Sequence, residues 1–180
     1  MPTIRLAEES DIPALECLIP LSVRGLQASH YSPEQMEAAI GSVFGVDRQL
    51  IRDGTYFVAA DANQLIGCGG WSKRKTLFGS DHHHATRDDA ELDPQSDAAR
   101  IRAFFVHPDY ARRGIGRAIV EACEHAIRGA GYQQIELAAT LPGEAFYQAC
   151  GYISGKREDV RLPNGLTLQI VRMTKQLSPR

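Results

Sequence analysis

The chain has 180 residues, of which 43% are hydrophobic and 23% charged; this composition is typical of a globular domain and excludes intrinsic disorder. The 20 basic and 22 acidic side chains give a formal net charge of -2, so no overall positive charge favours binding to nucleic acid or to an anionic membrane surface. The longest uncharged stretches, such as residues 62–72, are far shorter than the ~18 residues that a membrane span needs.

We therefore expect a single domain over residues 1–180, with no nucleic-acid partner and no membrane span. Residues 1–5 lack the basic start and the apolar stretch of a secretory signal. The four cysteines stand far apart with no C-x-x-C pair, which is typical of reduced thiols. These features favour a cytoplasmic location, and they leave the oligomeric state open between a monomer and a homodimer.

The N-terminal part of the chain predicts a strand, two helices and a β-hairpin. Residues 3–7 alternate as a strand does, and residues 10–13 combine a cap with an early proline, which indicates a helix start. The Ser-Pro-Glu-Gln segment at 32–35 indicates a second start, with a serine cap and a reciprocal glutamine. Residues 56–60 and 64–72 are β-favouring and flank a turn, as in a hairpin.

Residues 73–98 show no periodicity and predict a long loop. After a basic start the loop turns acidic, which would attract a cationic acceptor; the alternative is an acidic loop that only keeps the surface solvated. The consecutive histidines His82, His83 and His84 cannot all face one ion from a single element, and no spaced partner ligand is apparent, so we expect no metal site. The alternative is a metal site to which nearby Asp residues of the loop contribute.

The second half predicts a strand, a helix and a strand in that order. Residues 101–106 are apolar and β-favouring, residues 115–128 carry an apolar residue every three or four positions, and residues 134–139 form the next strand. A short helix over 142–149 and a closing strand over 166–174 follow. This order is that of a βαβ unit joined to the N-terminal hairpin.

The turn before residue 115 has the composition of an anion site. Gly114 and Gly116 allow the backbone to approach a phosphate, and the helix that begins here offers unpaired N–H groups and a partial positive charge. Positive side chains are added by Arg112, Arg113 and Arg117. The alternative interpretation is a glycine-containing turn with a solvated basic rim.

Two other phosphate-binding turns fit this segment less well. A P-loop requires Gly-Lys followed by Ser or Thr, which is absent here. A dinucleotide fingerprint requires its glycines directly after the strand, whereas about seven residues separate Val106 from Gly114.

Two segments of the second half resemble the signatures of one known family. Residues 106–110, Val-His-Pro-Asp-Tyr, followed by Arg-Arg-Gly-Ile-Gly-Arg-Ala at 112–118, resemble the acyl-CoA motif of the GNAT superfamily of N-acetyltransferases. Residues 145–152, Ala-Phe-Tyr-Gln-Ala-Cys-Gly-Tyr, are similar to its second signature. The resemblance implies an α/β (α+β) fold, with a mixed, mainly antiparallel central sheet flanked by helices and with splayed fourth and fifth strands.

The resemblance also implies the activity, which is acetyl-CoA-dependent transfer of an acetyl group to an amine of a small molecule or peptide by direct attack. A non-catalytic acyl-CoA-binding or regulatory module is the alternative, and a nucleotide-binding oxidoreductase is a third interpretation. By resemblance, the residues that bind the co-substrate acetyl-CoA are Phe105, Val106, Arg112, Arg113, Gly114, Ile115, Gly116, Arg117, Ala118 and Thr140. Ala111 and Thr140 stand where the family usually has Gln or Arg and Asn, respectively.

The resemblance implies that Tyr147 is the general acid that protonates the leaving sulfur; the alternative is a core tyrosine. With unperturbed pKa values this transfer is uphill by only ~2 kcal/mol. The fourth strand lacks the acid that the family often has there, so the base stays open among His30, Glu37, His107, Asp109 and a chain of water molecules. The family's variable acceptor wall would comprise Ser22, Arg24 and Tyr31, with the loop 73–98.

Overall fold

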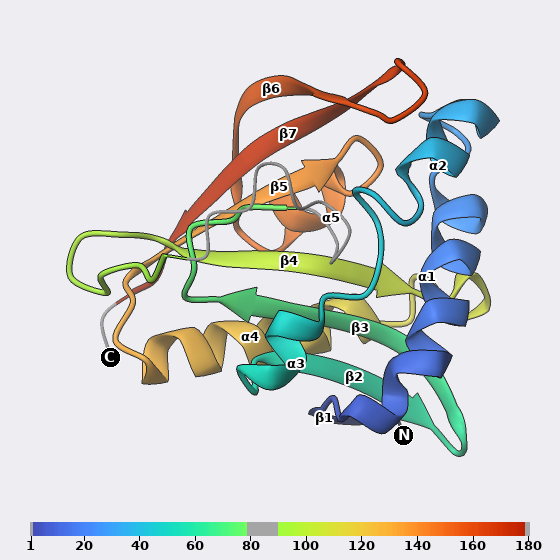
Figure 1. The fold of residues 1–180 in the computed structure, drawn as a ribbon. Coiled ribbons are helices and arrows are strands. Elements are labelled where there is room, and N and C mark those ends of the chain that lie inside the picture. The colour runs from blue at the N-terminus through green and yellow to red at the C-terminus, as the bar shows by residue number, and fades with distance from the viewer. Residues whose placement is uncertain (1, 79–89, 179–180) are drawn as a thin grey trace.

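The computed structural model describes residues 2–78 and 90–178, and one seven-stranded sheet runs through it (Figure 1). The strand order is β1-β2-β3-β4-β5-β7-β6. The strands are β1 (Thr3–Leu6), β2 (Tyr56–Asp61), β3 (Gln64–Ser72), β4 (Ala99–Val106), β5 (Gln134–Thr140), β6 (Ile153–Arg161) and β7 (Thr167–Gln176). Among these strands only β4 and β5 pair in parallel; the other neighbours are antiparallel. The mixed, mainly antiparallel sheet confirms the predicted fold class.

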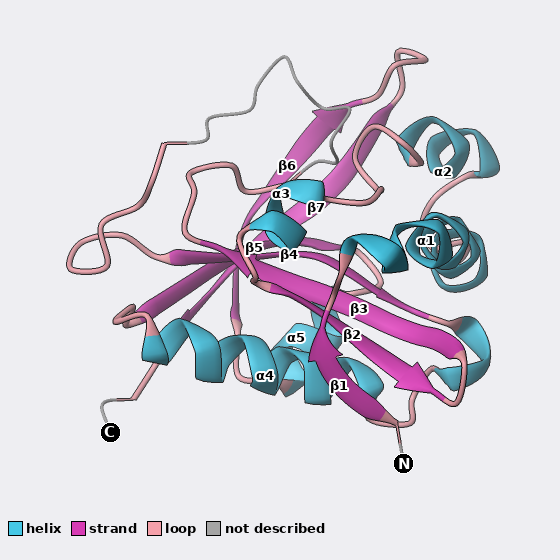
Figure 2. Cartoon of the chain, turned by 60° about the horizontal axis from the view of Figure 1, so that its bottom comes forward, coloured by secondary structure: helices cyan, strands magenta, loops and turns pink. Residues whose placement is uncertain are grey.

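Helices cover both faces of the sheet. They are α1 (Ile12–Leu26), α2 (Pro33–Ala39), α3 (Arg48–Arg52), α4 (Ile115–Gly129) and α5 (Glu144–Ala149), with the 3-10 helices η1 (Glu9–Asp11) and η3 (Pro108–Tyr110). Figure 2 shows α4 and α5 on one face and α1, α2 and α3 on the other. Each face has its own apolar core, one built with Leu15 and Ile19 of α1 and the other with Ile119 and Ile127 of α4.

Helix α4 confirms the helix that the sequence predicts over 115–128. Its apolar stripe is buried against the sheet, and Ile119 and Ile127 are fully enclosed. The helix approaches β3 closely at Gly67, where an added Cβ would stand 2.8 Å from a methyl group of Ile115. A glycine at this position therefore allows the N-terminus of α4 to lie against the sheet.

Helix α2 begins as the sequence predicts. The Ser32 side chain accepts a hydrogen bond from the Gln35 N–H at 3.2 Å, and the Gln35 side chain accepts one from the Ser32 N–H at 2.8 Å. Gln35 also donates its side-chain amide to the Thr167 carbonyl of β7 at 2.7 Å. The same residues thus start the helix and fasten it to β7.

Two elements are not anticipated by the sequence patterns. Helix α3 has only five residues, too few for a periodic signal. Strand β6, at the edge of the sheet, contains the charged run Lys-Arg-Glu-Asp at 156–159 and so lacks an apolar strand pattern. Within residues 2–78 and 90–178 no helix is long and apolar enough to cross a membrane, and no group of three or more His, Cys, Asp or Glu side chains could hold a metal ion. The histidines His82 to His84 lie outside the described residues.

Candidate active site

The sheet opens between β4 and β5. These strands pair only over Ala99–Ile101 and Ile135–Leu137, at the start of each strand. Further along β4, the register with β3 shifts where an extra residue is inserted, and Ala103 adopts a φ of +58°. A bulge of this kind bends a strand and ends its regular pairing. The bulge accounts for the divergence of β4 from β5, and this divergence confirms the predicted splay.

Two neighbouring residues hold the bulge in place. Tyr56 of β2 is completely buried, and its hydroxyl donates to the Ala103 carbonyl at 3.0 Å. On β3, Gly69 leaves room for Phe104, since an added Cβ would stand 2.3 Å from that ring. The bend in β4 is therefore stabilised by the Tyr56 hydrogen bond and by the packing of Phe104 over Gly69.

At the end of β4, the Val106 N–H points into the opening. The next N–H along, that of His107, donates to the Ile66 carbonyl of β3 at 2.9 Å. Successive N–H groups of a strand point to opposite sides, so that of Val106 faces away from β3. It donates to the side-chain oxygen of Ser22, on α1, at 3.2 Å. The neighbouring Phe105 lies opposite Cys68 of β3 in the register, and its ring contacts Phe44 edge-on at 5.9 Å.

The N-terminus of α4 presents free backbone donors. None of the N–H groups of residues 113–117 donates a hydrogen bond within the described part of the chain; the first to do so is that of Ala118, to the Gly114 carbonyl at 3.0 Å. Gly114 has a φ of +85°, and among the described residues no atom lies within 4 Å of where its Cβ would stand. The open approach and the free N–H groups suit an anion, so the residues fit a bound pyrophosphate.

Basic side chains surround these free donors. Arg112, with a φ of +65°, and Arg113 are exposed, and the Arg113 guanidinium lies 5.3 Å from the centre of the Tyr110 ring. Arg117 donates to the Ala149 carbonyl at the end of α5 at 3.0 Å. The charge is thus distributed on both sides of the turn, as an anion site requires.

Helix α5 packs directly against the start of α4. An added Cβ at Gly116 would stand 3.0 Å from the Phe146 ring, so this glycine serves helix packing. Thr140 lies at the end of β5, where its hydroxyl accepts from the Gly143 N–H at 3.2 Å in the turn that leads into α5.

Tyr147 is buried among aromatic rings beneath β4. Its ring contacts Phe104 at 6.2 Å, Phe146 at 5.0 Å and Tyr152 at 5.6 Å between centroids. Burial raises the pKa of Tyr147 well above its usual value, so the hydroxyl is protonated at neutral pH.

The residues left open as a base have the following partners. His107 accepts from the Asp109 N–H through Nδ1 at 3.2 Å and caps η3, and Asp109 is exposed. Glu37 binds Arg24 through two hydrogen bonds of 2.7 and 2.9 Å, which lower the pKa of the Glu37 carboxyl. His30 lies 2.8 Å from the Ser29 hydroxyl. No base is assigned by these contacts.

The three residues expected at the acceptor wall have different environments. Ser22 is buried beside Val106, as described above. Arg24 is exposed and pairs with Glu37 between α1 and α2. Tyr31 is buried, donates to the Gln169 carbonyl at 2.7 Å and accepts from the Leu141 N–H at 2.8 Å. Tyr31 thus joins β5 and β7 beyond the point where the sheet opens.

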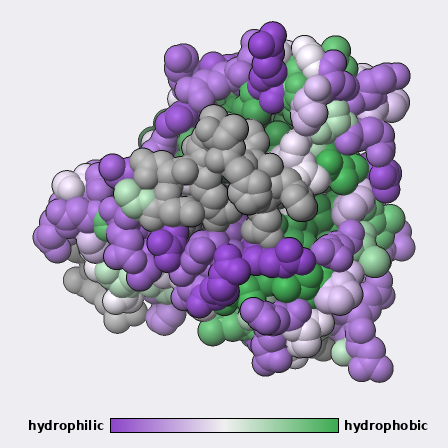
Figure 3. Space-filling view, viewed as in Figure 1, coloured by the Kyte–Doolittle hydropathy of each residue, from purple (hydrophilic) through white to green (hydrophobic). Residues whose placement is uncertain are grey.

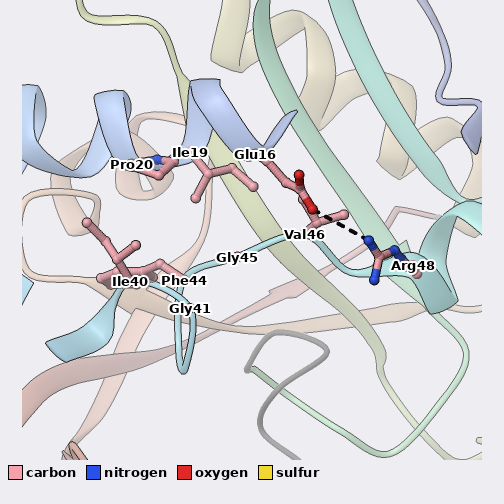
Figure 4. A pocket seen from close by; sticks show the side chains of 9 residues that line it. All are labelled: Glu16, Ile19, Pro20, Ile40, Gly41, Phe44, Gly45, Val46 and Arg48. Carbon is pink, nitrogen blue, oxygen red and sulfur yellow. Dashed lines mark hydrogen bonds and ion pairs between the residues drawn. The ribbon is translucent and has the colours of Figure 1, made fainter. Parts of the chain in front are cut away.

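A pocket that the sequence does not reveal lies between α1 and the segment 40–48 (Figure 4). Ile19, Phe44 and Val46 contribute apolar walls, and an ion pair of 3.5 Å between Glu16 and Arg48 lies at its edge. Figure 3 shows apolar surface over this part of the face, beside mostly polar surface. Ile19 stands one helical turn before Ser22, and Phe44 contacts Phe105, so the pocket adjoins the opening of the sheet.

Comparisons with known proteins agree with this arrangement. Residues 52–154 match the family model of the acetyltransferase (GNAT) domain. Among curated proteins, no sequence matches the chain. Among solved structures, a GCN5-related N-acetyltransferase from Rhodopseudomonas palustris is similar with a TM-score of 0.72 and 23% identity, over 98% of this chain and 96% of that one.

Two more distant structures share the fold. The PaiA N-acetyltransferase from Thermoplasma acidophilum, in complex with coenzyme A, has a TM-score of 0.64 and 17% identity, over 98% of this chain and 99% of that one. The ribosomal-protein-S18-alanine N-acetyltransferase from Escherichia coli has a TM-score of 0.59 and 17% identity, over 100% and 96%. Since the family model covers more than half of the sequence, this chain belongs to the GNAT family of acetyltransferases, whose co-substrate is acetyl-CoA.

Proposed function

We propose that this chain, folded as one domain over residues 1–180, transfers the acetyl group of acetyl-CoA to the nitrogen of an amine on a small molecule or peptide. The observation that carries the proposal is the opening of the sheet between β4 and β5. From the end of β4, at this opening, the chain passes through η3 to the N-terminus of α4, where the first backbone N–H groups have no partner among the described residues. The N-terminus of α4 suits a pyrophosphate, and the end of β4 suits a thioester.

The pyrophosphate end comprises residues 112–118. Five consecutive N–H groups, the partial positive charge of a 15-residue helix and three arginines converge there. Gly114 leaves the approach to the backbone open. The thioester end is the last residue of β4, because the Val106 N–H is directed into the opening and Thr140 closes β5 on the other side.

The reaction consists of one bond exchange and two proton movements. The nitrogen lone pair forms the new C–N bond at the acetyl carbon, the C–S bond breaks, and the sulfur receives the Tyr147 hydroxyl proton. The surplus proton of the attacking nitrogen leaves to water, from which the tyrosine is reprotonated. Burial keeps the Tyr147 hydroxyl protonated at neutral pH, so the proton is present when the C–S bond breaks, although a thiolate is a weaker base than a tyrosinate.

The acceptor enters from the face covered by α1. The pocket between α1 and the segment 40–48 adjoins the end of β4, and its apolar walls suit a hydrophobic portion of the acceptor. The loop 73–98, which contains the acidic residues that would attract a cationic amine, lies partly outside the described residues.

Thiol release from acetyl-CoA, measured with cationic, neutral and anionic amines at low and high salt, tests this function. We expect release that depends on the amine, with a preference for cationic amines that weakens as salt rises if the acidic loop contributes. Tight binding of acetyl-CoA without thiol release for any amine would instead establish a non-catalytic acyl-CoA-binding module.

A further inference from the structure

Ser22 stands at the point where the sheet opens. It lies on α1, is only 4% exposed, and accepts the Val106 N–H at 3.2 Å across 84 residues of sequence. One helical turn later, Gly25 contacts Pro108, and an added Cβ there would stand 2.4 Å from the proline ring. These two contacts hold one face of α1 against the end of β4 and fix the position of the serine.

The hydroxyl of Ser22 has an unused donor. Its oxygen accepts from Val106, but within residues 2–78 and 90–178 its own hydrogen has no acceptor. By contrast, Ser42 donates to the carbonyl four residues earlier, that of Ala38, at 2.8 Å, as serines in helical turns often do. An unsatisfied buried donor costs about 1–3 kcal/mol, so a group that satisfies it when bound gains a strong contact.

We propose that the Ser22 hydroxyl donates a hydrogen bond to the carbonyl oxygen of the acetyl thioester, with the Val106 N–H behind it. This inference rests on the proposed function. A chain from N–H to hydroxyl to carbonyl is cooperative, because the N–H polarises the hydroxyl and makes it a better donor. A hydroxyl bonded to this carbonyl oxygen would face the negative charge that develops there as the amine attacks, and such a group stabilises the transition state most in a site shielded from water.

The test is the infrared carbonyl stretch of acetyl-CoA, labelled with 13C at the carbonyl and bound to the full chain. A hydrogen bond to the carbonyl lowers this frequency, so we expect a higher frequency in Ser22→Ala than in the wild type. Ser22→Thr keeps the hydroxyl and should remain near the wild-type value. The turnover number of Ser22→Ala should fall on the order of 10²-fold, with little change in the dissociation constant of acetyl-CoA.

Thr55→Val is the matched control, since it removes another buried hydroxyl that already donates, to the Leu50 carbonyl at 3.3 Å. It should leave the frequency unchanged. A Ser22→Ala protein with the wild-type frequency overturns the inference, even if its turnover falls, because the serine would then only support the Val106 backbone. The frequency is measured without an acceptor. Absent turnover in the wild type would therefore overturn the proposed function, while the carbonyl frequency would still show whether Ser22 donates to the thioester.

Discussion

At the scale of single residues, Tyr147 combines a protonated hydroxyl with a buried ring. Three aromatic rings enclose it, and burial raises its pKa, which makes the proton available at neutral pH but harder to give up. For Tyr147→Phe we therefore expect the turnover number to fall on the order of 10²-fold, because the ring remains and only the proton donor is lost. Steady-state kinetics measure the turnover number, and titration with acetyl-CoA measures its affinity for each protein.

The control for this variant is Tyr132→Phe. Its hydroxyl donates to the Leu92 carbonyl at 3.1 Å in the same apolar core, so its removal affects stability without affecting the proton supply. Equal turnover in Tyr147→Phe and the wild type would show that solvent or another group protonates the sulfur.

Gly114 offers a direct test of the proposed pyrophosphate site. Gly114→Ala places a Cβ in space that is open among the described residues, at a φ of +85°. We expect the affinity for acetyl-CoA to fall at least about tenfold, which corresponds to about 1.4 kcal/mol. In Gly114→Asn the affinity for acetyl-CoA should fall by a similar factor, although asparagine tolerates this backbone conformation better than alanine.

Acetyl-pantetheine, which lacks the pyrophosphate, separates binding from folding in this test. Its Michaelis constant should be the same in Gly114→Ala and the wild type if the substitution acts on the pyrophosphate alone. An equal loss with both substrates would place the defect elsewhere. Gly116 cannot serve for this purpose, because a side chain there would press on Phe146.

At the scale of elements, Tyr31 joins three parts of the chain at the edge of the opening. Its hydroxyl satisfies the Gln169 carbonyl of β7 and the Leu141 N–H after β5, and burial raises the pKa of Tyr31 to about 12. Tyr31→Phe leaves both backbone groups without this partner, so we expect a loss of about 2 kcal/mol or more in unfolding free energy.

Urea denaturation measures this loss. The comparison is Tyr132→Phe, which removes a tyrosine hydroxyl that makes one hydrogen bond instead of two. A Tyr31→Phe protein no less stable than Tyr132→Phe would contradict the role assigned to this junction. Because Tyr31 also fastens the start of α2, we expect the Michaelis constant of the acceptor to rise more than that of acetyl-CoA.

The elements that the sequence predicts are those with local signals. The helix 115–128 has a periodic apolar stripe, α2 has a reciprocal cap, and the hairpin 56–72 has β-favouring runs around a turn. Helix α3 is too short for a period. Strand β6 is mostly polar because it lies at the sheet edge, where backbone pairing with β7 determines its conformation.

The candidate site is predictable from sequence only where its residues are close together. The turn 112–118 and the segment 145–152 each show their chemistry within a few positions. The bulge at Ala103 depends on Tyr56 and Gly69, and the contact of Ser22 with Val106 spans 84 residues. Contacts of such separation are set by packing and leave no pattern along the chain.

At the scale of the whole molecule, the proposed function assigns separate roles to the two helical layers. Helices α4 and α5 lie on one face, with the free N–H groups and Tyr147, and α1, α2 and α3 lie on the other, with Ser22 and the pocket (Figure 2). The sheet separates these layers except where β4 and β5 diverge. A co-substrate held on one face and an acceptor held on the other can therefore meet only at this opening.

The stability of the whole chain should depend on pH through two partly enclosed ion pairs. Hydrogen bonds from Arg5 lower the pKa of the Asp11 carboxyl, and those from Arg74 lower the pKa of Asp53. A carboxyl whose pKa is lower in the folded state contributes stability above its unfolded pKa, about 3.9, and this stability is lost as the pH falls through the folded pKa. We therefore expect little change from these pairs above about pH 5 and a progressive loss below about pH 4.

Urea midpoints measured from pH 7 to pH 2 test this dependence. The double variant Asp11→Asn, Asp53→Asn should be less stable than the wild type at pH 7. Its stability should also decline less steeply below pH 4, because asparagine does not titrate and the two carboxyl groups that take up protons on unfolding are gone. Glu37→Gln is the matched control: Glu37 also forms two hydrogen bonds with an arginine, but both side chains are 55% exposed, so water and salt screen the pair. A decline equally steep in the double variant and the wild type would mean that other carboxyl groups govern acid unfolding.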